Sequence, residues 1–322
     1  MPLTDLPLEE LERYAPVLDA PEDLAEFWAT TLDEARRSED RAVLRPVTTP
    51  VRELVVEDLT FPGFGGEPVR GWVVRPRREG RLPCVVEYIG YGGGRGLPAE
   101  KLQWAAAGYV HVVMDTRGQG SGWGSGGDTP DPHGAGPAVP GFMTRGIERP
   151  ETYYYRRVFT DAVRLLDAVR DLPFVDPARV AVTGASQGGG IALAAAALAP
   201  EHVAACLPDV PFLCHFRRAV ALTPEPPFTE ISRYLAVHRG SDEAVFRTLS
   251  YVDAAVLARW ATAPALFSVA LMDGIVLPST VYAAFHAYAG AEKAIEVYAW
   301  NGHEGGQVPH WVRQAEWLSA RF

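Results

Sequence analysis

The segment Gly184-Ala185-Ser186-Gln187-Gly188 constrains the fold of this chain more than any other stretch. It fits the pattern G-x-S-x-G and stands between an apolar run at 180–183, expected to be a strand, and one at 191–198, expected to be a helix. Side chains two residues before and after the serine would collide in so tight a turn, so both positions are glycine. The pattern predicts that Ser186 is a nucleophile, rather than an incidental serine in a Gly-rich turn, with the following helix N-terminus stabilising negative charge.

Short apolar runs alternate with helical stretches along most of the chain. The expected strands lie at 84–89, 109–114, 179–183, 265–271 and 295–300, and the expected helices at 99–107, 151–172, 191–198, 280–288 and 311–321. A hairpin of strands around 54–59 and 69–74 precedes them, with a turn at 62–66. This order predicts an α/β fold with a mostly parallel, twisted sheet that helices cover on both faces.

The 322 residues suggest two domains by length alone, but single α/β domains often reach this size. We expect one domain over 1–322, with a helical N-terminal extension at 1–50 that includes a helix near 21–37. Residues 200–262 hold several prolines among helical pieces. They predict a cap-like insertion near the active site, because such excursions between sheet strands often cover binding sites.

A serine nucleophile needs a base, and the base needs an orienting acid. Around such an elbow the chain order is serine, acid, histidine. Asp273 follows the apolar strand at 265–271, at the strand end where open α/β sheets place their chemistry. Asp209 and Asp253 compete for the role. Asp209 follows the elbow helix too closely and Asp253 lies in a helical stretch, so Asp273 is the predicted acid.

The predicted base is His303, which lies on the Gly-rich loop after the last expected strand. His286 falls in a helix, and His310 at the start of the closing helix is expected to be a cap or a surface residue. The expected roles are Ser186 as nucleophile, His303 as general base and then acid, and Asp273 as the group that fixes the imidazole tautomer.

The oxyanion needs two backbone N–H donors. One is expected from Gln187, directly after the serine, and the other from the loop 90–94, where Tyr91 or a neighbouring glycine would supply it. A phosphate cradle is the alternative for this loop, but no Lys-Ser/Thr pair follows its glycines. The loop at 117–122 is not a dinucleotide fingerprint, because no helix follows it. We expect it to be structural and near the mouth of the site, with Arg117 fixing loops by ion pairs.

Thirty basic and forty acidic residues give a net charge of −10. Such a charge repels nucleic-acid phosphates and anionic membranes, so neither is an expected partner. The N-terminus lacks the pattern of a signal peptide, the longest apolar run (191–199) is too short to span a bilayer, and the three cysteines favour a reducing compartment. We therefore expect a cytoplasmic protein.

Several motifs together resemble the acetyl xylan esterases and cephalosporin C deacetylases of carbohydrate esterase family seven, within the α/β-hydrolase superfamily. The resemblance covers nearly the whole chain. Its most specific motifs are Arg117-Gly118-Gln119, Gly184-Ala185-Ser186-Gln187-Gly188-Gly189 and His303-Glu304, with Glu151-Thr152-Tyr153-Tyr154-Tyr155-Arg156-Arg157 between them.

The resemblance implies an α/β-hydrolase fold and release of acetate from small substrates, among them acetylated xylo-oligosaccharides and cephalosporin C. It implies no metal and no organic cofactor, a ring-like homohexamer, and acyl transfer to peroxide or alcohols as a side activity. It implies that the N–H groups of Tyr91 and Gln187 form the oxyanion hole, and that Phe212, Pro227 and Ile275 line an acyl pocket. Where the family reads Cys-Pro-Pro, this chain has Val276-Leu277-Pro278, which is expected to make the pocket wall more aliphatic.

The favoured hypothesis is a serine esterase that deacetylates small esters through an acyl-enzyme. An oligopeptidase-type peptidase or amidase shares the elbow, but such chains carry a large extra domain for which this chain lacks the length. A hydrolase-like binding protein with a dead site is the third hypothesis, and the complete set Ser186, Asp273 and His303 argues against it.

Overall fold

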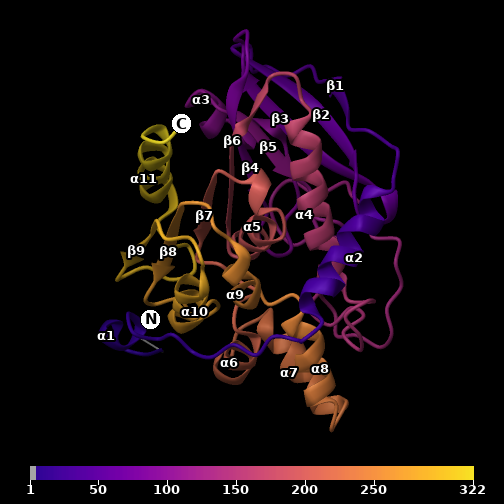
Figure 1. Cartoon of the computed structure of the whole chain (residues 1–322), viewed down its shortest axis with the longest axis vertical. Coiled ribbons are helices and arrows are strands. Elements are labelled where there is room, and N and C mark those ends of the chain that lie inside the picture. The colour runs from indigo at the N-terminus through magenta and orange to yellow at the C-terminus, as the bar shows by residue number, and fades with distance from the viewer. Residues whose placement is uncertain (1–4) are drawn as a thin grey trace.

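A single nine-stranded sheet runs through the computed structural model, which describes residues 5–322 (Figure 1). The strands are β1 (Val43–Pro46), β2 (Leu54–Pro62), β3 (Pro68–Pro76), β4 (Leu82–Tyr88), β5 (Val110–Met114), β6 (Val175–Ala185), β7 (Ala205–Asp209), β8 (Ala265–Ala270) and β9 (Lys293–Tyr298). Their order across the sheet is β1-β2-β3-β5-β4-β6-β7-β8-β9. The pairs from β5 to β9 are parallel, whereas β1, β2 and β3 pair antiparallel with their neighbours, including β3 with β5.

Helices cover both faces of this sheet. The α-helices of the described residues are α1 (Leu8–Leu11), α2 (Leu24–Arg36), α3 (Gln103–Ala106), α4 (Tyr154–Arg170), α5 (Gln187–Leu198), α6 (Phe216–Leu222), α7 (Phe228–Val237), α8 (Asp242–Ser250), α9 (Ala254–Leu257), α10 (Pro278–Ala287) and α11 (Gln307–Ser319). Figure 1 shows α3 and α11 on one side of the central strands and α4 and α5 on the other. This arrangement confirms the predicted α/β architecture. The prediction rested on the apolar strands, which need helices on both faces of the sheet to keep them from water.

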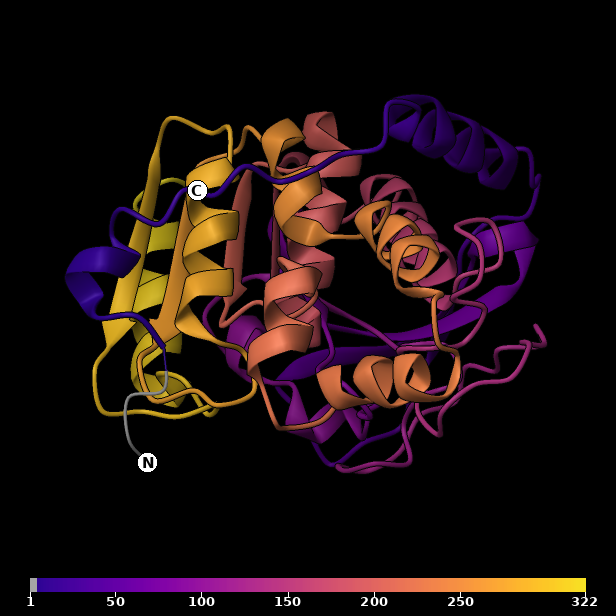
Figure 2. The same ribbon diagram turned by 90° about the horizontal axis from the view of Figure 1, so that it is seen from below.

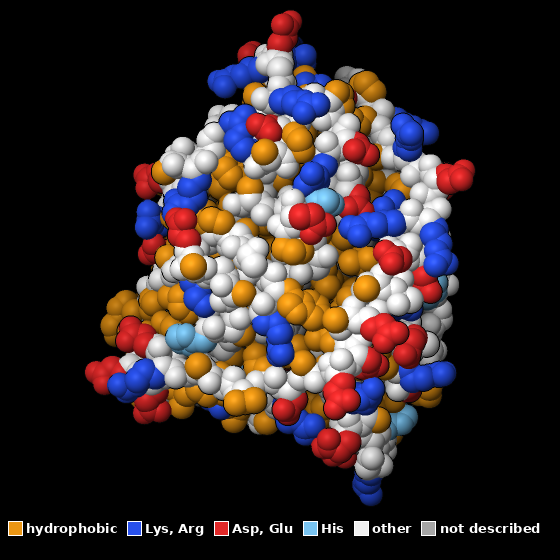
Figure 3. Space-filling view, viewed as in Figure 1, with side chains coloured by type: hydrophobic (Ala, Val, Ile, Leu, Met, Phe, Trp, Pro, Cys, Tyr) orange, Lys and Arg blue, Asp and Glu red, His pale blue; other side chains and the backbone are white. Residues whose placement is uncertain are grey.

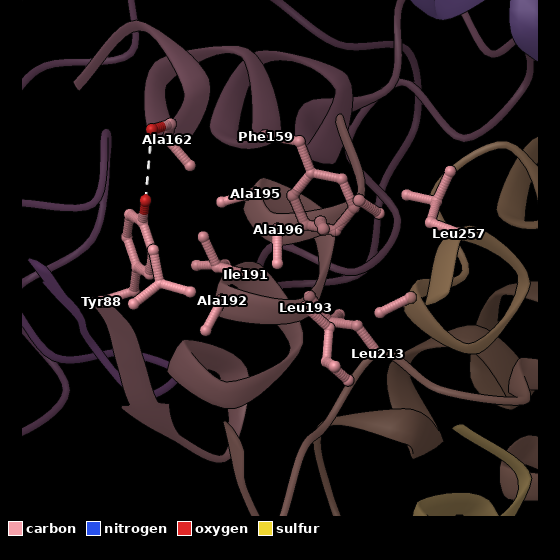
Figure 4. Close-up of a cluster of buried hydrophobic side chains, with 14 of the residues drawn as sticks. Tyr88, Phe159, Ala162, Ile191, Ala192, Leu193, Ala195, Ala196, Leu213 and Leu257 are labelled. Atoms are coloured by element: carbon pink, nitrogen blue, oxygen red, sulfur yellow. Dashed lines mark hydrogen bonds between the residues drawn. The ribbon is translucent and has the colours of Figure 1, made fainter. Parts of the chain in front are cut away.

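Helix α5 lies at the centre of the larger hydrophobic core (Figure 4). Its sequence after the elbow consists of glycine, alanine, isoleucine and leucine, and all residues from Gln187 to Ala197 are buried. A helix that is apolar all round belongs in a core. Its small side chains let β4 and α4 approach closely, and the Tyr88 hydroxyl at the end of β4 donates to the Ala162 carbonyl of α4 at 3.2 Å.

Two expectations for the flanking segments are corrected. The whole region 200–262 was expected to be an excursion between sheet strands, but its residues 205–209 form β7 between β6 and β8, and the excursion begins only after Asp209. Likewise, β1 lies inside the segment 1–50 that was expected to be helical. Both strands are only four or five residues long and β7 ends in Pro208-Asp209, so neither gives a clear strand pattern.

The N-terminal segment crosses the molecule. Figure 2 shows it running from α1, beside the β8–β9 end of the sheet, to α2 on the other side. Helix α2 packs through Trp28 against α4 and against the residue that follows α8. The Trp28 indole stacks on Phe159 of α4, and its N–H donates to the Tyr251 carbonyl at 2.8 Å. These contacts bind the N-terminal helix to the body of the protein.

Basic and acidic side chains are interspersed over the face shown in Figure 3, and hydrophobic side chains gather in the hollow near its centre. Within residues 5–322, no helix has both the length and the apolarity that crossing a membrane requires.

Candidate active site

Ser186 occupies the sharp turn between β6 and α5, as the elbow pattern predicts. Its backbone has φ 56° and ψ −120°, a strained conformation for a residue with a side chain. A methyl group at Gly184 would lie 2.6 Å from the Gly188 carbonyl oxygen, and one at Gly188 would overlap the Tyr88 carbonyl oxygen of β4. Glycine is therefore required two residues before and two residues after the serine, because any side chain there would clash with the backbone.

Three strand ends bring the predicted triad together. Ser186 follows β6, Asp273 follows β8 and His303 follows β9, and these parallel strands end at the same edge of the sheet. The Ser186 Oγ lies 3.0 Å from His303 Nε2, and His303 Nδ1 lies 2.8 Å from Asp273 Oδ2. With the carboxylate accepting from Nδ1–H, Nε2 is left to accept from the serine hydroxyl.

The two other candidates for the acid, Asp209 and Asp253, contact groups outside the triad. Asp209 faces Gln314 Nε2 at 2.7 Å and His310 Nε2 at 2.8 Å. Asp253 caps α9 and accepts from the backbone N–H groups of His215 and Phe216.

Of the two rejected histidines, His286 lies in α10 as expected. The expectation for His310 is wrong, because this side chain lies inside α11 and is buried. Its Nδ1 lies 2.8 Å from the Tyr298 hydroxyl and its Nε2 lies 2.8 Å from Asp209 Oδ1, so the imidazole belongs to the interior rather than the surface. A polar residue near a helix start resembles a cap in sequence, and only the packing against β9 reveals the difference.

The loop after β4 stands beside the elbow. Tyr91 lies in a turn closed by the Gly93 N–H and the Gly90 carbonyl at 3.1 Å. Within the described part of the chain, the Tyr91 N–H has no protein acceptor. Gln187 is the first residue of α5, where a backbone N–H has no acceptor inside the helix. These are the two N–H groups that the sequence singled out.

A buried amide pair joins this loop to the elbow. Gln119 accepts from the Gly92 N–H at 2.7 Å and donates to Gln187 Oε1 at 2.8 Å. The Gln187 side chain also donates to the Ile89 carbonyl at 3.0 Å and accepts from the Tyr155 hydroxyl at 2.8 Å. The pair fixes the two candidate oxyanion donors relative to each other.

Arg117 holds neighbouring loops by ion pairs, as expected. Its guanidinium binds both oxygens of Asp161 at 2.6 and 2.8 Å, and Glu67 Oε2 at 2.6 Å. Burial alone would lower the pKa of Arg117, but the attraction of the Asp161 and Glu67 carboxylates is stronger and raises it. The arginine lies far along the chain from these acids, so the ion pairs fasten the loop after β5 to α4 and to the β2–β3 turn.

The Tyr91 side chain ties the same loop to α7. Its hydroxyl donates to Glu230 Oε1 at 2.6 Å and accepts from the Phe142 N–H at 2.6 Å. The other Glu230 oxygen accepts from the Met143 N–H at 3.0 Å. Burial raises the pKa of Glu230, and burial followed by the adjacent Glu230 carboxylate raises that of Tyr91. Sequence inspection did not single out Glu230, since a lone Glu in an amphipathic helix gives no signal.

A cavity of about 340 Å³ opens over Ser186 and His303. Its other lining residues are Gly90, Tyr91, Trp123, Pro226, Pro227 and Ile275. Of the predicted pocket residues, Pro227 and Ile275 line this cavity. Phe212 and Val276 do not, because both are buried behind it, Phe212 with its ring centroid 4.4 Å from that of Phe228. Trp123 and Pro226 were missed, as each lies in a Gly- or Pro-rich loop without periodicity.

A larger hollow of about 620 Å³ lies between segment 17–21 and helices α6 and α8, away from the triad. It holds no nucleophile paired with a base, so the smaller cavity is the candidate active site. Among residues 5–322, no cluster of three or more His, Cys, Asp or Glu side chains is placed to hold a metal ion.

Comparison with known proteins identifies the family. The family model described as acetyl xylan esterase (AXE1) matches residues 1–321. Acetyl esterase Axe7A of Xylanibacter ruminicola is 24% identical over 319 residues, which cover 88% of this chain and 64% of that protein. This chain thus spans only part of the length of that relative.

Two solved structures are similar over almost their whole length. Acetyl xylan esterase from Paenibacillus sp. R4 has a TM-score of 0.92 and 38% identity, covering 98% of this chain and 100% of its own. Acetyl xylan esterase 1 from Thermoanaerobacterium sp. JW/SL YS485 has a TM-score of 0.90 and 33% identity, covering 98% and 99%. Dipeptidyl peptidase 4 of Porphyromonas gingivalis, at 18% identity and a TM-score of 0.61, shares the fold alone, over 36% of its chain.

These matches confirm the predicted α/β-hydrolase fold and the resemblance from which it was expected. The homologues indicate a carboxylic ester hydrolase. The chain belongs to the acetyl xylan esterase (AXE1) family.

Proposed function

We propose that this protein is a serine esterase that removes acetyl groups from small carbohydrate esters, such as acetylated xylo-oligosaccharides. The observation that supports this most is the continuous hydrogen-bonded line from Asp273 through His303 to Ser186, at the floor of a cavity beside two unpaired backbone N–H groups. The names of the related proteins supply the substrate class.

In this proposal His303 removes the proton of Ser186 as the serine oxygen attacks the acetyl carbonyl carbon. The N–H groups of Gln187 and Tyr91 stabilise the resulting oxyanion. The alcohol leaves with the proton from His303, and the acetyl group stays on Ser186. Water, activated by His303, then releases acetate and restores the serine. Asp273 keeps Nδ1 protonated throughout and stabilises the imidazolium.

The acyl group would enter the inner part of the cavity, where Pro227 is buried and Ile275 is half-buried. The acyl-enzyme is open to other nucleophiles, so acetyl transfer to peroxide or small alcohols belongs to the proposal. Cephalosporin C, which carries a small acetyl ester, is a further proposed substrate. By family resemblance we also propose a cytoplasmic homohexamer, whose mass light scattering after size exclusion would measure.

Acetate release from xylose tetraacetate tests the function against its main rival. An esterase should hydrolyse this ester at least about 10³-fold more efficiently, in kcat/KM, than a peptide nitroanilide, since the cavity offers no peptide-binding groups that would offset the harder amide. A fluorophosphonate should label Ser186 in the native protein. Efficient anilide cleavage would favour a peptidase, and absence of both labelling and ester hydrolysis would indicate an inactive binding protein.

A further inference from the structure

An exposed indole stands at the mouth of the cavity. Trp123 lies in the loop between β5 and α4, is 55% exposed, and lines the cavity together with Ser186 and His303. What makes this indole informative is its place in the wall of a cavity that also holds the candidate nucleophile and base, because aromatic side chains commonly line ligand sites.

The indole is held in place before any substrate binds. Its Nε1–H donates to the Tyr91 carbonyl at 2.7 Å. The ring rests against the glycine loop: a methyl group at Gly93 would overlap it, and those at Gly90 and Gly92 would lie 3.4 and 3.7 Å from it. The glycines thus leave room for the ring. A ring fixed in advance loses little side-chain entropy when a ligand packs on it.

The rest of the lining offers a sugar few hydrogen bonds. Apart from Ser186 and His303, the described lining residues are glycine, proline, isoleucine, Trp123 and Tyr91, and the Tyr91 hydroxyl is already bonded to Glu230. Trp123 and Pro226 form the exposed rim, whereas Pro227 is buried. The departing alcohol must lie towards the exposed rim if the acyl group occupies the inner part.

We propose that Trp123 is the platform on which the sugar ring of the substrate stacks. A pyranose presents a face of C–H groups, which carry slight positive charge and match the electron-rich face of an indole. With so few polar groups in the cavity, this contact would make Trp123 the residue that favours sugar esters over esters of simple alcohols. The inference rests on the proposed esterase function.

The test compares acetyl esters of two different alcohols, a sugar in xylose tetraacetate and a simple alcohol in ethyl acetate. We expect Trp123→Ala to lower the ratio of their kcat/KM values about tenfold, mainly by raising KM for the sugar ester. Trp123→Phe keeps an aromatic face but not the hydrogen bond to Tyr91, and should retain most of the sugar preference. Trp300→Ala removes an indole that is 82% exposed and outside the cavity, and should leave the ratio unchanged.

Two outcomes would overturn the inference. If Trp123→Ala lowers kcat/KM for both esters by the same factor, the indole only positions the Tyr91 loop. If neither value changes, the sugar does not use the ring. Thermal unfolding of each variant separates these results from misfolding. Failure of the esterase function itself looks different, because the wild-type protein would then hydrolyse neither ester.

Discussion

The carboxylate of Asp273 accepts three hydrogen bonds at once. Oδ1 accepts from the N–H groups of Ile275 and Val276, at 2.9 and 2.8 Å, and Oδ2 faces His303. The side chain is fully buried. Its two backbone partners fix the rotation of the carboxylate, so the oxygen that meets the imidazole is set by the turn after β8.

Asp273→Asn should lower kcat for xylose tetraacetate by about 10⁴-fold with little loss of thermal stability. The amide oxygen can still accept from the backbone, which turns the NH₂ group towards His303 Nδ1 and forces the proton onto Nε2. That tautomer cannot accept the serine proton. Steady-state kinetics measure the effect.

Asp209→Asn is the matched control, since Asp209 ends the neighbouring strand β7 and faces His310 and Gln314 instead of the triad. It should retain kcat within about tenfold, in line with a structural acid remote from the reacting atoms. Equal losses in the two variants would remove the argument for Asp273.

Ile275 and Val276 are adjacent in the chain, but only Ile275 lines the cavity. Ile275→Ala should therefore raise the kcat/KM ratio of butyryl to acetyl nitrophenyl ester by about tenfold, because removing three carbons opens room for a longer acyl chain. Val276→Ala should leave the ratio unchanged and cost about 1–3 kcal/mol of unfolding free energy, as it empties buried space. The reverse pattern would place the acyl group against Val276.

At the scale of the element, the elbow depends on close contact between α5 and β4. Gly188→Ala should lower the unfolding free energy by at least about 2 kcal/mol, because the new methyl group would overlap the Tyr88 carbonyl oxygen. Urea denaturation measures this. Gly134→Ala, in a loop where the added methyl meets nothing within 4 Å, should be near neutral. A neutral Gly188→Ala variant would show that β4 and α5 can separate without cost.

The elements most visible in sequence are those with long patterns. The elbow, α4, and the apolar strands β4, β5 and β8 combine length with clear periodicity. The chain order of serine, acid and histidine selected three residues whose side chains lie within hydrogen-bond distance of one another in the structure. Strand β7 was missed because five residues ending in Pro-Asp carry no alternation. Phe212 and Val276 were placed on the cavity wall although they lie behind it, since residue type does not tell which layer a side chain occupies.

Loop residues were the least predictable part of the site. Trp123 and Pro226 reach the cavity from segments without periodicity, and Glu230 reaches Tyr91 across 139 positions of sequence. Their roles depend on how separate loops meet at one edge of the sheet. The division into a single domain with an extension and an insertion stays a prediction.

At the scale of the whole molecule, charge pairs on the α11 side of the sheet couple stability to pH. Burial would raise the pKa of Glu87 on β4, but Lys101 and His111 outweigh it and lower the pKa to about 2, from 4.5. A depressed carboxyl pKa adds stability above the unfolded value, and this stability is lost as the pH falls from about 4.5 towards 2.

Wild-type protein should therefore lose its stability advantage over Glu87→Gln in acid. The difference in unfolding free energy should shrink by up to about 1.4 kcal/mol per pH unit as the pH falls below 4.5. Urea unfolding at pH 7, 5, 4 and 3.5 checks this. A difference that does not change down to pH 3.5 would contradict the ion pair.

The most direct test of the central claim is the activity of Ser186→Ala on xylose tetraacetate. Because Ser186 forms the covalent bond to the acetyl group in this account, its loss should lower kcat/KM by at least about 10⁴-fold while the protein keeps its fold. Acetate release at the wild-type rate from a folded Ser186→Ala protein would contradict the assignment of the nucleophile and, with it, the proposed mechanism.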